Sequence, residues 1–218
     1  MPQPTFLHLP DTKQDSIRQA GLEEFALNAY DSASITRIVK TLKIAKGSIY
    51  QYFQNKSDFY QYLFDYARDT RAQALESVSV PDDYKDWFKW LEMYLEKRVQ
   101  FDLTHPVISG LLRMAFRERF SEEVGELIRQ HRAELLQWHQ DLLRKQQTDK
   151  KINKKIKVKH AALLALQLTE GLTELLVLQH DLDLAAHMQS NEPITDVSEK
   201  EIRKTVKGLV KMLKRGLQ

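Results

Sequence analysis

The chain has 218 residues and a formal net charge of +3 at pH 7, a length that can bury a sizeable core in one or two compact units. Charged residues make up 29% of it, whereas it has only 7 glycines and 6 prolines, so the composition favours long helices over a turn-rich β fold. The absence of cysteine excludes disulfide bonds, thiol catalysis and cysteine-ligated zinc.

The first ten residues, MPQPTFLHLP, contain three prolines and no helical periodicity, and we expect them to form a loose arm. They lack the basic start and the apolar core of a signal peptide. We also expect that no apolar run along the chain is long enough to cross a bilayer. These features predict a cytoplasmic protein without a membrane partner.

Three short helices are predicted to follow the arm. The first begins at Asp11 or Thr12, both good caps, and ends before a connection at residues 28–33. Ser34 can cap the second helix. The apolar face of that second helix consists of Ile35, Ile38 and Val39.

A tight turn at residues 42–45 leads into the third helix, residues 46–53, which is too short to be stable alone. Ile49 and Phe53 are four residues apart, so they share one face and can anchor it. The polar and aromatic residues of this third helix that do not anchor it are available to contact another molecule. A helix-turn-helix places its second helix in the major groove of DNA, and these residue types suit that surface.

Local charge supports the same interpretation. Residues 31–57 carry five lysines and arginines against one acid, Asp31. A positive excess of this kind attracts DNA phosphates. A solvated helical face would show the same charge, so the motif carries more weight than the charge.

The remainder of the chain is predicted to contribute six more helices, which gives an all-α fold with about nine. Ser57 is expected to cap a helix that runs to about residue 77, and Pro81-Asp82-Asp83 to open the next. His105-Pro106 ends that helix, because proline cannot continue one. Further helices are expected at about 107–118 and 121–147, before a lysine-rich loop at 148–157.

Two long helices are predicted to close the chain. Residues 160–178 are apolar nearly all round, so this helix must be buried on most sides. Ser198 and Glu201 form a capping box at the start of the last helix, which has an apolar seam. The surplus apolar surface of these two helices predicts an interface between two copies of the chain, in which each copy contributes both helices.

Residues 13–66 resemble the N-terminal DNA-binding domain of the TetR family of transcriptional regulators. The resemblance is carried by Phe25-Ala26, Tyr30-Asp31, Ser34-Ile35, Ile38, Lys46-Gly47-Ser48-Ile49-Tyr50, Tyr52-Phe53 and Lys56. The chain departs from the family pattern at Ala29, where glycine is usual, and in the turn. There Lys43 replaces a glycine that takes a left-handed backbone easily, and Ala45 replaces a capping serine.

The resemblance implies a helix-turn-helix DNA-binding domain at residues 11–70 and a helical effector-binding and dimerisation domain at 71–218. It also implies a set of residues at the DNA. These are Ser34, Thr36, Arg37, Lys46, Gly47, Ser48, Tyr50, Gln51, Tyr52 and Lys56. Ser34 and Lys56 are expected to hold phosphates, and Ser48 and Gln51 to read bases.

The resemblance further implies a homodimer that binds a palindromic DNA operator, acts as a repressor and is released by a small-molecule effector. Aromatic and methionine side chains suit an apolar or planar effector. The candidate lining residues are Trp87, Trp90, Tyr94, Phe101, Met114, Phe116, Trp138 and Leu168. For each single residue, ordinary helical core is the more expected role. Arg98, Arg113 and Arg117 are possible anchors for an anion, although a surface role is expected for each.

Other functions find less support. The chain has no HExxH, GxSxG, P-loop or dinucleotide-binding glycine pattern, so neither an enzyme nor a cofactor is predicted. His180, Asp183 and His187 share a helical spacing, but three possible ligands at a helix end do not predict a metal site. The lysines at 150–159 favour a solvated loop over a second DNA patch. A ligand-binding or interaction protein whose helix-turn-helix no longer reads DNA remains the alternative.

Overall fold

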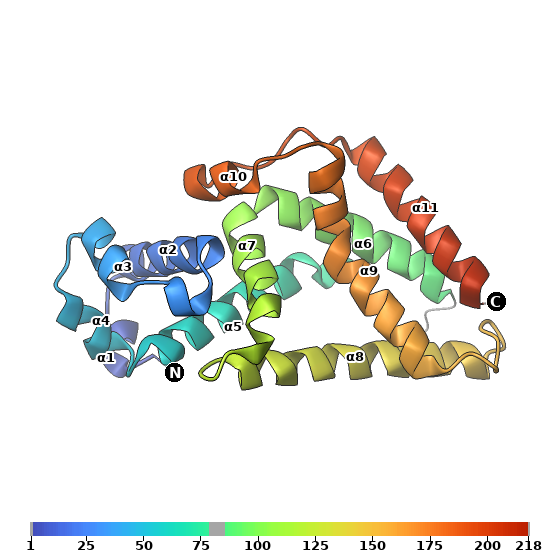
Figure 1. Ribbon diagram of the computed structural model, residues 1–218, viewed down its shortest axis with the longest axis horizontal. Coiled ribbons are helices and arrows are strands. Elements are labelled where there is room, and N and C mark those ends of the chain that lie inside the picture. Colours follow the sequence, from blue (N-terminus) through green and yellow to red (C-terminus); the bar gives the residue numbers. More distant parts are fainter. Residues whose placement is uncertain (1, 79–85, 218) are drawn as a thin grey trace. The chain divides into compact units, whose positions relative to one another are not determined.

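The computed structural model describes residues 2–78 and 86–217, and within these ranges it contains eleven α-helices and no β-strand (Figure 1). The predicted all-α class with an N-terminal helix-turn-helix is confirmed. Two short helices, α1 (Pro4–Leu7) and α10 (Leu184–Ser190), account for the difference from the nine expected. The helix opening expected at Pro81-Asp82-Asp83 lies outside the described residues.

The helices group into two compact units. Unit 1 comprises the described parts of Met1–Thr70, His105–Arg129 and Leu184–Glu192. Unit 2 comprises those of Arg71–Thr104, Gln130–Asp183 and Pro193–Gln218. The stretch expected to form a separate C-terminal domain, residues 71–218, therefore contributes two segments to unit 1.

Unit 1 is built around α2, which packs against α3, α7 and α10. Its helices are α1, α2 (Asp11–Leu27), α3 (Ile35–Leu42), α4 (Lys46–Tyr52), most of α5 (Lys56–Ala74), α7 (Pro106–Ala115), the start of α8 (Gly125–Thr148) and α10. Two 3-10 turns, η1 (Tyr30–Ser32) and η3 (Phe116–Phe120), complete it. Its buried core is rich in aromatic rings, which lets a small set of helices bury a large apolar area.

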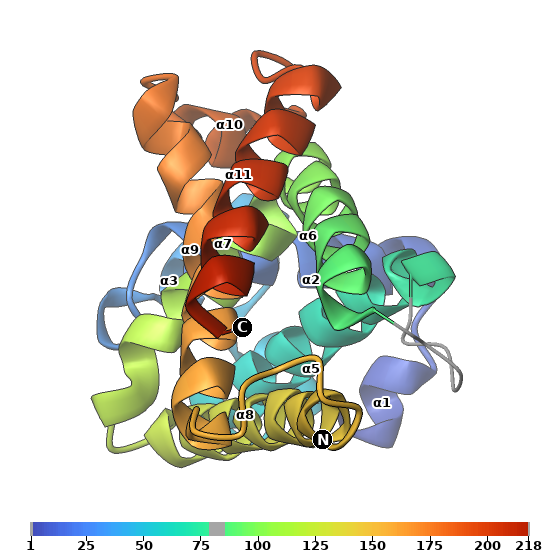
Figure 2. The same ribbon diagram turned by 90° about the vertical axis from the view of Figure 1, so that its right-hand side faces the viewer.

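Unit 2 contains α6 (Trp87–Thr104), most of α8, α9 (Val158–Gln179), α11 (Glu199–Leu217) and the short η2 (Glu76–Val78). Helices α6, α9 and α11 contact one another pairwise (Figure 2). The predicted capping box at the start of α11 is confirmed, since the amide of Glu201 donates to Ser198 Oγ at 3.3 Å. In return, the amide of Ser198 donates to Glu201 Oε2 at 3.0 Å.

The expectation of a loose N-terminal arm was wrong. Residues Pro4–Leu7 form α1, and Phe6 is completely buried. The centroid of its ring lies 5.1 Å from that of Phe53 and 5.3 Å from that of Tyr62. The buried Phe6 ring, with the hydrogen bond from the amide of Gln3 to the carbonyl of Tyr52 at 2.8 Å, orders the segment despite its prolines and its lack of periodicity.

The expectation about apolar runs also needs correction. Helix α9 is long and apolar enough to cross a membrane by length and composition alone. Part of its surface is nevertheless core, since Ala161, Ala165, Leu172 and Leu176 are buried. Core helices of soluble proteins pass the same test of length and composition, so the criterion by itself does not assign α9 to a membrane.

Gly21 in α2 generates a stability prediction. A Cβ atom there would lie 2.6 Å from Cζ of Phe59 and 2.7 Å from Cδ1 of Leu63, and both of these side chains are fully buried. We expect Gly21→Ala to lower the free energy of unfolding by about 1–3 kcal/mol, because the core must shift to admit the methyl group. Urea-induced unfolding followed by circular dichroism measures the change.

Gly47→Ala is the matched control. A Cβ atom at Gly47 would meet nothing within 4 Å. Replacing a glycine within α4 should therefore leave stability unchanged or raise it by up to about 1 kcal/mol. Equal destabilisation by the two substitutions would contradict the proposed packing of Gly21.

Candidate DNA interface

Helices α3 and α4 form the predicted helix-turn-helix. Ser34 caps α3, because its Oγ accepts a hydrogen bond from the amide of Arg37 at 3.4 Å. Lys43 ends α3 in a left-handed conformation, with φ 54° and ψ 40°, and the amide of Ile44 donates to the carbonyl of Val39 at 3.1 Å. The turn therefore keeps the geometry that glycine usually allows, at the cost of strain at a lysine.

Helix α4 is held to unit 1 by its apolar side. Ile49 is 1% exposed, and Phe53, which follows the helix, is completely buried. The centroid of the Phe53 ring lies 4.5 Å from that of Phe59 in α5. Ala45 precedes α4 and provides no side-chain cap, as expected. Packing, not capping, therefore stabilises this seven-residue helix.

The outer side of α4 carries five of the ten residues expected at the DNA. Lys46, Gly47, Tyr50 and Gln51 are exposed, and Ser48 is half-buried. The Tyr50 side chain is 46% exposed. The open space next to Gly47 allows another molecule to approach the backbone closely. These five residues form one presented surface, which we call the α4 face.

Tyr52 does not belong to the α4 face. It is 7% exposed, and the centroid of its ring lies 6.0 Å from that of Phe6, nearly edge to face. Helical periodicity explains the difference, because Tyr52 lies three residues after Ile49 on the buried side of α4. The structure therefore assigns Tyr52 to the core and leaves Tyr50 as the exposed tyrosine of the pair.

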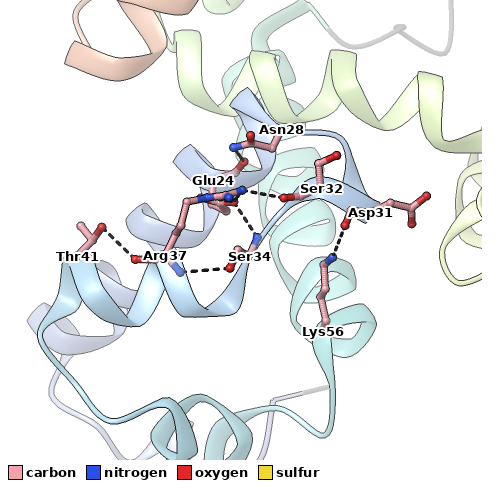
Figure 3. Close-up of polar contacts among 8 residues, drawn as sticks. All are labelled: Glu24, Asn28, Asp31, Ser32, Ser34, Arg37, Thr41 and Lys56. Atoms are coloured by element: carbon pink, nitrogen blue, oxygen red, sulfur yellow. Dashed lines mark hydrogen bonds and ion pairs between the residues drawn. The ribbon is translucent and has the colours of Figure 1, made fainter.

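Arg37 is bound within unit 1 (Figure 3). Its guanidinium donates from Nη2 to Glu24 Oε1 at 2.5 Å and to the carbonyl of Ser32 at 2.7 Å. The same Glu24 oxygen accepts the amide hydrogen of Ser34 at 2.8 Å. The hydrogen bond that Arg37 donates to the Glu24 carboxylate raises the pKa of Arg37. Glu24 thus fixes both the start of α3 and the side chain expected to contact a phosphate.

Lys56 is also held by its own chain. Its Nζ lies 4.4 Å from the centre of the Tyr30 ring and 3.5 Å from the carbonyl oxygen of Asp31. These contacts fasten the connection between α2 and α3 to the start of α5. Ser57 was expected to cap α5, but it does not. Asn55 caps the helix instead, since its Oδ1 accepts the amide hydrogen of Asp58 at 2.8 Å. Thr36 is exposed on α3.

Sequence reasoning did not identify Glu24 as part of this interface. It is a single carboxylate on α2, ten residues before Ser34, and no local motif connects the two positions. Only the crossing of α2 and α3 brings them together.

The candidate effector residues do not gather at one place. Trp90, Tyr94 and Trp138 lie together in unit 2, with ring centroids of Trp90 and Trp138 5.4 Å apart. Met114 and Phe116 belong to unit 1. The remaining candidates, Trp87, Phe101 and Leu168, belong to unit 2, where the first two are buried and the last is half-buried.

Metal binding gains no support from the part of the chain that the structure describes. Within residues 2–78 and 86–217, no group of three or more histidines and acids lies close enough together to hold an ion. His180, Asp183 and His187 therefore give no candidate metal centre.

Glu24 provides a test of how the start of α3 is held. Glu24→Ala should lower the free energy of unfolding by about 1–3 kcal/mol, because the Ser34 amide loses its acceptor. Arg37→Ala should be milder, since Glu24 still accepts from Ser34. Thermal unfolding of both variants shows which of them is less stable. A larger loss of stability in Arg37→Ala than in Glu24→Ala would contradict the role of Glu24 in holding the start of α3.

Comparison with known proteins agrees with this geometry. Residues 17–63 match the family model described as bacterial regulatory proteins, tetR family. The transcriptional regulator AcuR of Cereibacter sphaeroides is 43% identical over 44 residues, which is 20% of each chain. An HTH-type transcriptional regulator of Staphylococcus aureus is 28% identical over 103 residues, 45% of this chain and 53% of that protein. The alignments thus span about a fifth and about half of these relatives.

One solved structure extends the similarity over the whole chain. A TetR family transcriptional regulator from Chloroflexus aurantiacus superposes with a TM-score of 0.81 at 26% identity, covering 100% of this chain and 98% of that one. The helix-turn-helix, the family match and this whole-chain similarity lead to one conclusion. Residues 17–63 form a DNA-binding domain of the tetR family, and over its whole length the chain is similar to a TetR family transcriptional regulator.

Proposed function

We propose that the protein is a ligand-responsive transcriptional repressor that binds a palindromic DNA operator as a homodimer. The observation that carries this proposal is the α4 face. Its polar and aromatic side chains are exposed, while Ile49 and Phe53 fix the helix to a rigid aromatic core. A helix presented in this way can enter the major groove without losing contacts within its own unit.

The residues of the α4 face have distinct roles in this proposal. Lys46 binds a phosphate or the edge of a guanine, and Gln51 pairs with an adenine through two hydrogen bonds. Tyr50 places its ring against a thymine methyl group or its hydroxyl on a phosphate. Ser48 reads a base, and Gly47 lets the backbone approach the DNA. Thr36 and Ser34 contact phosphates from the start of α3.

Arg37 and Lys56 act as positioning residues in the revised proposal. Their contacts with Glu24 and with Tyr30 hold the start of α3 and the start of α5. Each can still attract phosphate through its charge, because Arg37 is exposed and Lys56 is half-buried.

A homodimer is proposed from the apolar residues of α9 and α11 that remain exposed. Leu163, Leu164 and Leu178 of α9 are 46%, 57% and 74% exposed, and Met212 of α11 is 69% exposed. A groove of about 450 Å³, lined in part by Leu175, Leu209 and Met212, lies between these helices. Pairing with a second copy would bury these side chains and provide two reading helices for a palindrome.

Effector control is proposed to act through helices that contribute residues to both units. Helices α5 and α8 are the two that do so. An effector that binds unit 2 in only one of two conformations would change the spacing of the two α4 helices, which must match roughly 34–36 Å, one turn of DNA. By linkage, the operator must weaken effector binding by the same factor.

The DNA proposal is tested by selecting fragments of source DNA on the purified protein at moderate salt and sequencing what is retained. We expect one palindromic sequence to be enriched, and Lys46→Ala with Tyr50→Ala to abolish the enrichment. Gln51→Ala should cost about 1–3 kcal/mol at the base it reads and relax the preference there.

Lys97→Ala is the matched control, because Lys97 is an exposed lysine on α6 in unit 2. It should leave the selected sequence and the affinity unchanged. Retention without any shared sequence, lost as salt rises, would reject specific reading and favour a protein whose helix-turn-helix no longer reads DNA.

The dimer is tested by sedimentation equilibrium. The protein should have twice the 25.6 kDa mass of one chain, and Leu164→Glu with Leu178→Glu should give a monomer, because four charges would otherwise be buried in the dimer. Phe120→Glu is the control, since Phe120 is 79% exposed and belongs to η3 of unit 1, not to α9 or α11. A dimer that survives the double substitution would place the interface elsewhere.

A further inference from the structure

One face of α6 in unit 2 combines aromatic and charged residues. Trp90, Tyr94, Arg98 and Asp102 follow at intervals of four, so they lie on the same side of the helix. Trp90 is 5% exposed, Arg98 is 7% exposed and Asp102 is 8% exposed. Arg98 was expected at the surface, and its burial is a feature that sequence reasoning missed. We call these four residues the α6 stripe.

Arg98 carries a hydrogen-bond donor that the surrounding structure does not use. Its Nε lies 3.8 Å from Asp102 Oδ2, beyond hydrogen-bonding distance, and has no other partner among the described residues. Asp102 Oδ2 instead accepts from the hydroxyl of Thr173 at 2.8 Å. Buried donors are almost always paired, so a free one within a charged group indicates a place for an acceptor from outside the chain.

Arg98 stays charged in this environment. Burial alone lowers the pKa of Arg98, but the nearby oxygens of Tyr94 and Asp102 outweigh it and raise the pKa above its usual value. A buried guanidinium that cannot lose its proton favours an anion, and its planar fork matches a carboxylate.

A second unused polar atom lies close to Arg98. His139 of α8 is 1% exposed, and its Nδ1 has no hydrogen-bond partner among the described residues. Burial and the charge of Arg98 lower the pKa of His139 to about 4, so the ring is neutral at pH 7. A neutral imidazole can bond a ligand oxygen without adding charge to the cluster.

Three aromatic rings form a wall beside these polar groups. The centroid of Trp138 lies 5.4 Å from that of Trp90, 6.1 Å from that of Tyr94 and 4.8 Å from that of His139. Trp138 and Tyr94 are half-buried, whereas Arg98 and His139 are buried. A flat apolar body suits the aromatic wall, and an oxyanion suits the guanidinium behind it.

Acidic groups in the same cluster limit the charge of the ligand. Asp102 lies beside Arg98, and Glu170 of α9 accepts from Arg132 at 3.0 Å. Burial raises the pKa of Glu170, although the charges of Arg132 and Arg98 oppose the shift. These carboxyl groups would repel a second negative charge on a ligand, so a monoanion fits better than a dianion.

We propose that the α6 stripe, with Trp138 and His139, binds a small aromatic monocarboxylate, whose carboxylate accepts from Arg98 and whose ring lies against Trp90, Tyr94 and Trp138. Its role as the effector rests on the proposed function. The site replaces the earlier expectation of a purely apolar or planar ligand with one that carries a single negative charge.

The test is a titration of the full-length protein with four probes, followed by tryptophan fluorescence, since two of the three tryptophans belong to the site. The probes are benzoate, the dianion phthalate, neutral benzyl alcohol and acetate, which has no ring. We expect saturable binding of benzoate and binding at least about tenfold weaker for each of the other three.

Arg98→Lys is the decisive variant, because it keeps the buried charge that faces Asp102 but removes the planar fork. It should weaken benzoate binding at least about tenfold and leave benzyl alcohol binding unchanged. The control is Arg117→Met, since Arg117 is an exposed arginine of unit 1. If circular dichroism shows that Arg98→Lys does not fold, Trp138→Leu tests the aromatic wall and should weaken benzoate but not acetate.

The proposal is overturned if benzoate shows no saturable binding up to about 10 mM, if benzyl alcohol binds as well as benzoate, or if the variants leave benzoate binding unchanged. DNA selection with the same preparation separates this result from the proposed function. An enriched palindrome without benzoate binding would reject the site alone, whereas loss of DNA selection would reject the regulator itself.

Discussion

The packing of Phe53 on its aromatic neighbours is the interaction on which the reading surface depends. Helix α4 has seven residues and no side-chain cap, so its own hydrogen bonds do not stabilise it. Phe53 lies 4.5 Å from Phe59 and 5.1 Å from Phe6, measured between ring centroids, and these contacts fasten the end of α4 to α5 and α1. Everything presented on the opposite side of α4, from Lys46 to Gln51, takes its position from this buried contact.

A second constraint acts on the backbone before α4. Lys43 occupies a left-handed conformation that costs a lysine energy, and Ala45 offers no cap. Both departures from the family pattern are tolerated because Glu24 holds the start of α3 and the aromatic core holds the end of α4. Packing at the two ends of the helix-turn-helix therefore compensates for the strain at Lys43 and for the missing cap at Ala45.

Unit 2 differs from unit 1 in the kind of side chains that it buries. Its centre contains charged and polar groups that do not saturate one another, notably Arg98 Nε and His139 Nδ1. Burying such groups lowers stability unless they gain partners, whereas unit 1 buries chiefly apolar and aromatic side chains. In the proposed function, the unpaired polar groups of unit 2 would bind the ligand and the well-packed unit 1 would bind DNA. Ligand binding could then be coupled to a change of conformation without weakening the DNA-binding fold.

The sequence by itself determined the features that depend on neighbouring residues: the helical class, the break at His105-Pro106, the capping box at Ser198 and the helix-turn-helix with its buried Ile49 and Phe53. Periodicity and capping act within a few residues, so a single sequence is enough to read them. Only the tertiary structure decided that the N-terminal segment is ordered with Phe6 in the core, and that Arg37 is bound to Glu24. The burial of Arg98 was likewise decided only by the tertiary structure. The partners that determine exposure and charge balance come from helices far apart in the chain, and no local sequence pattern shows how these helices cross.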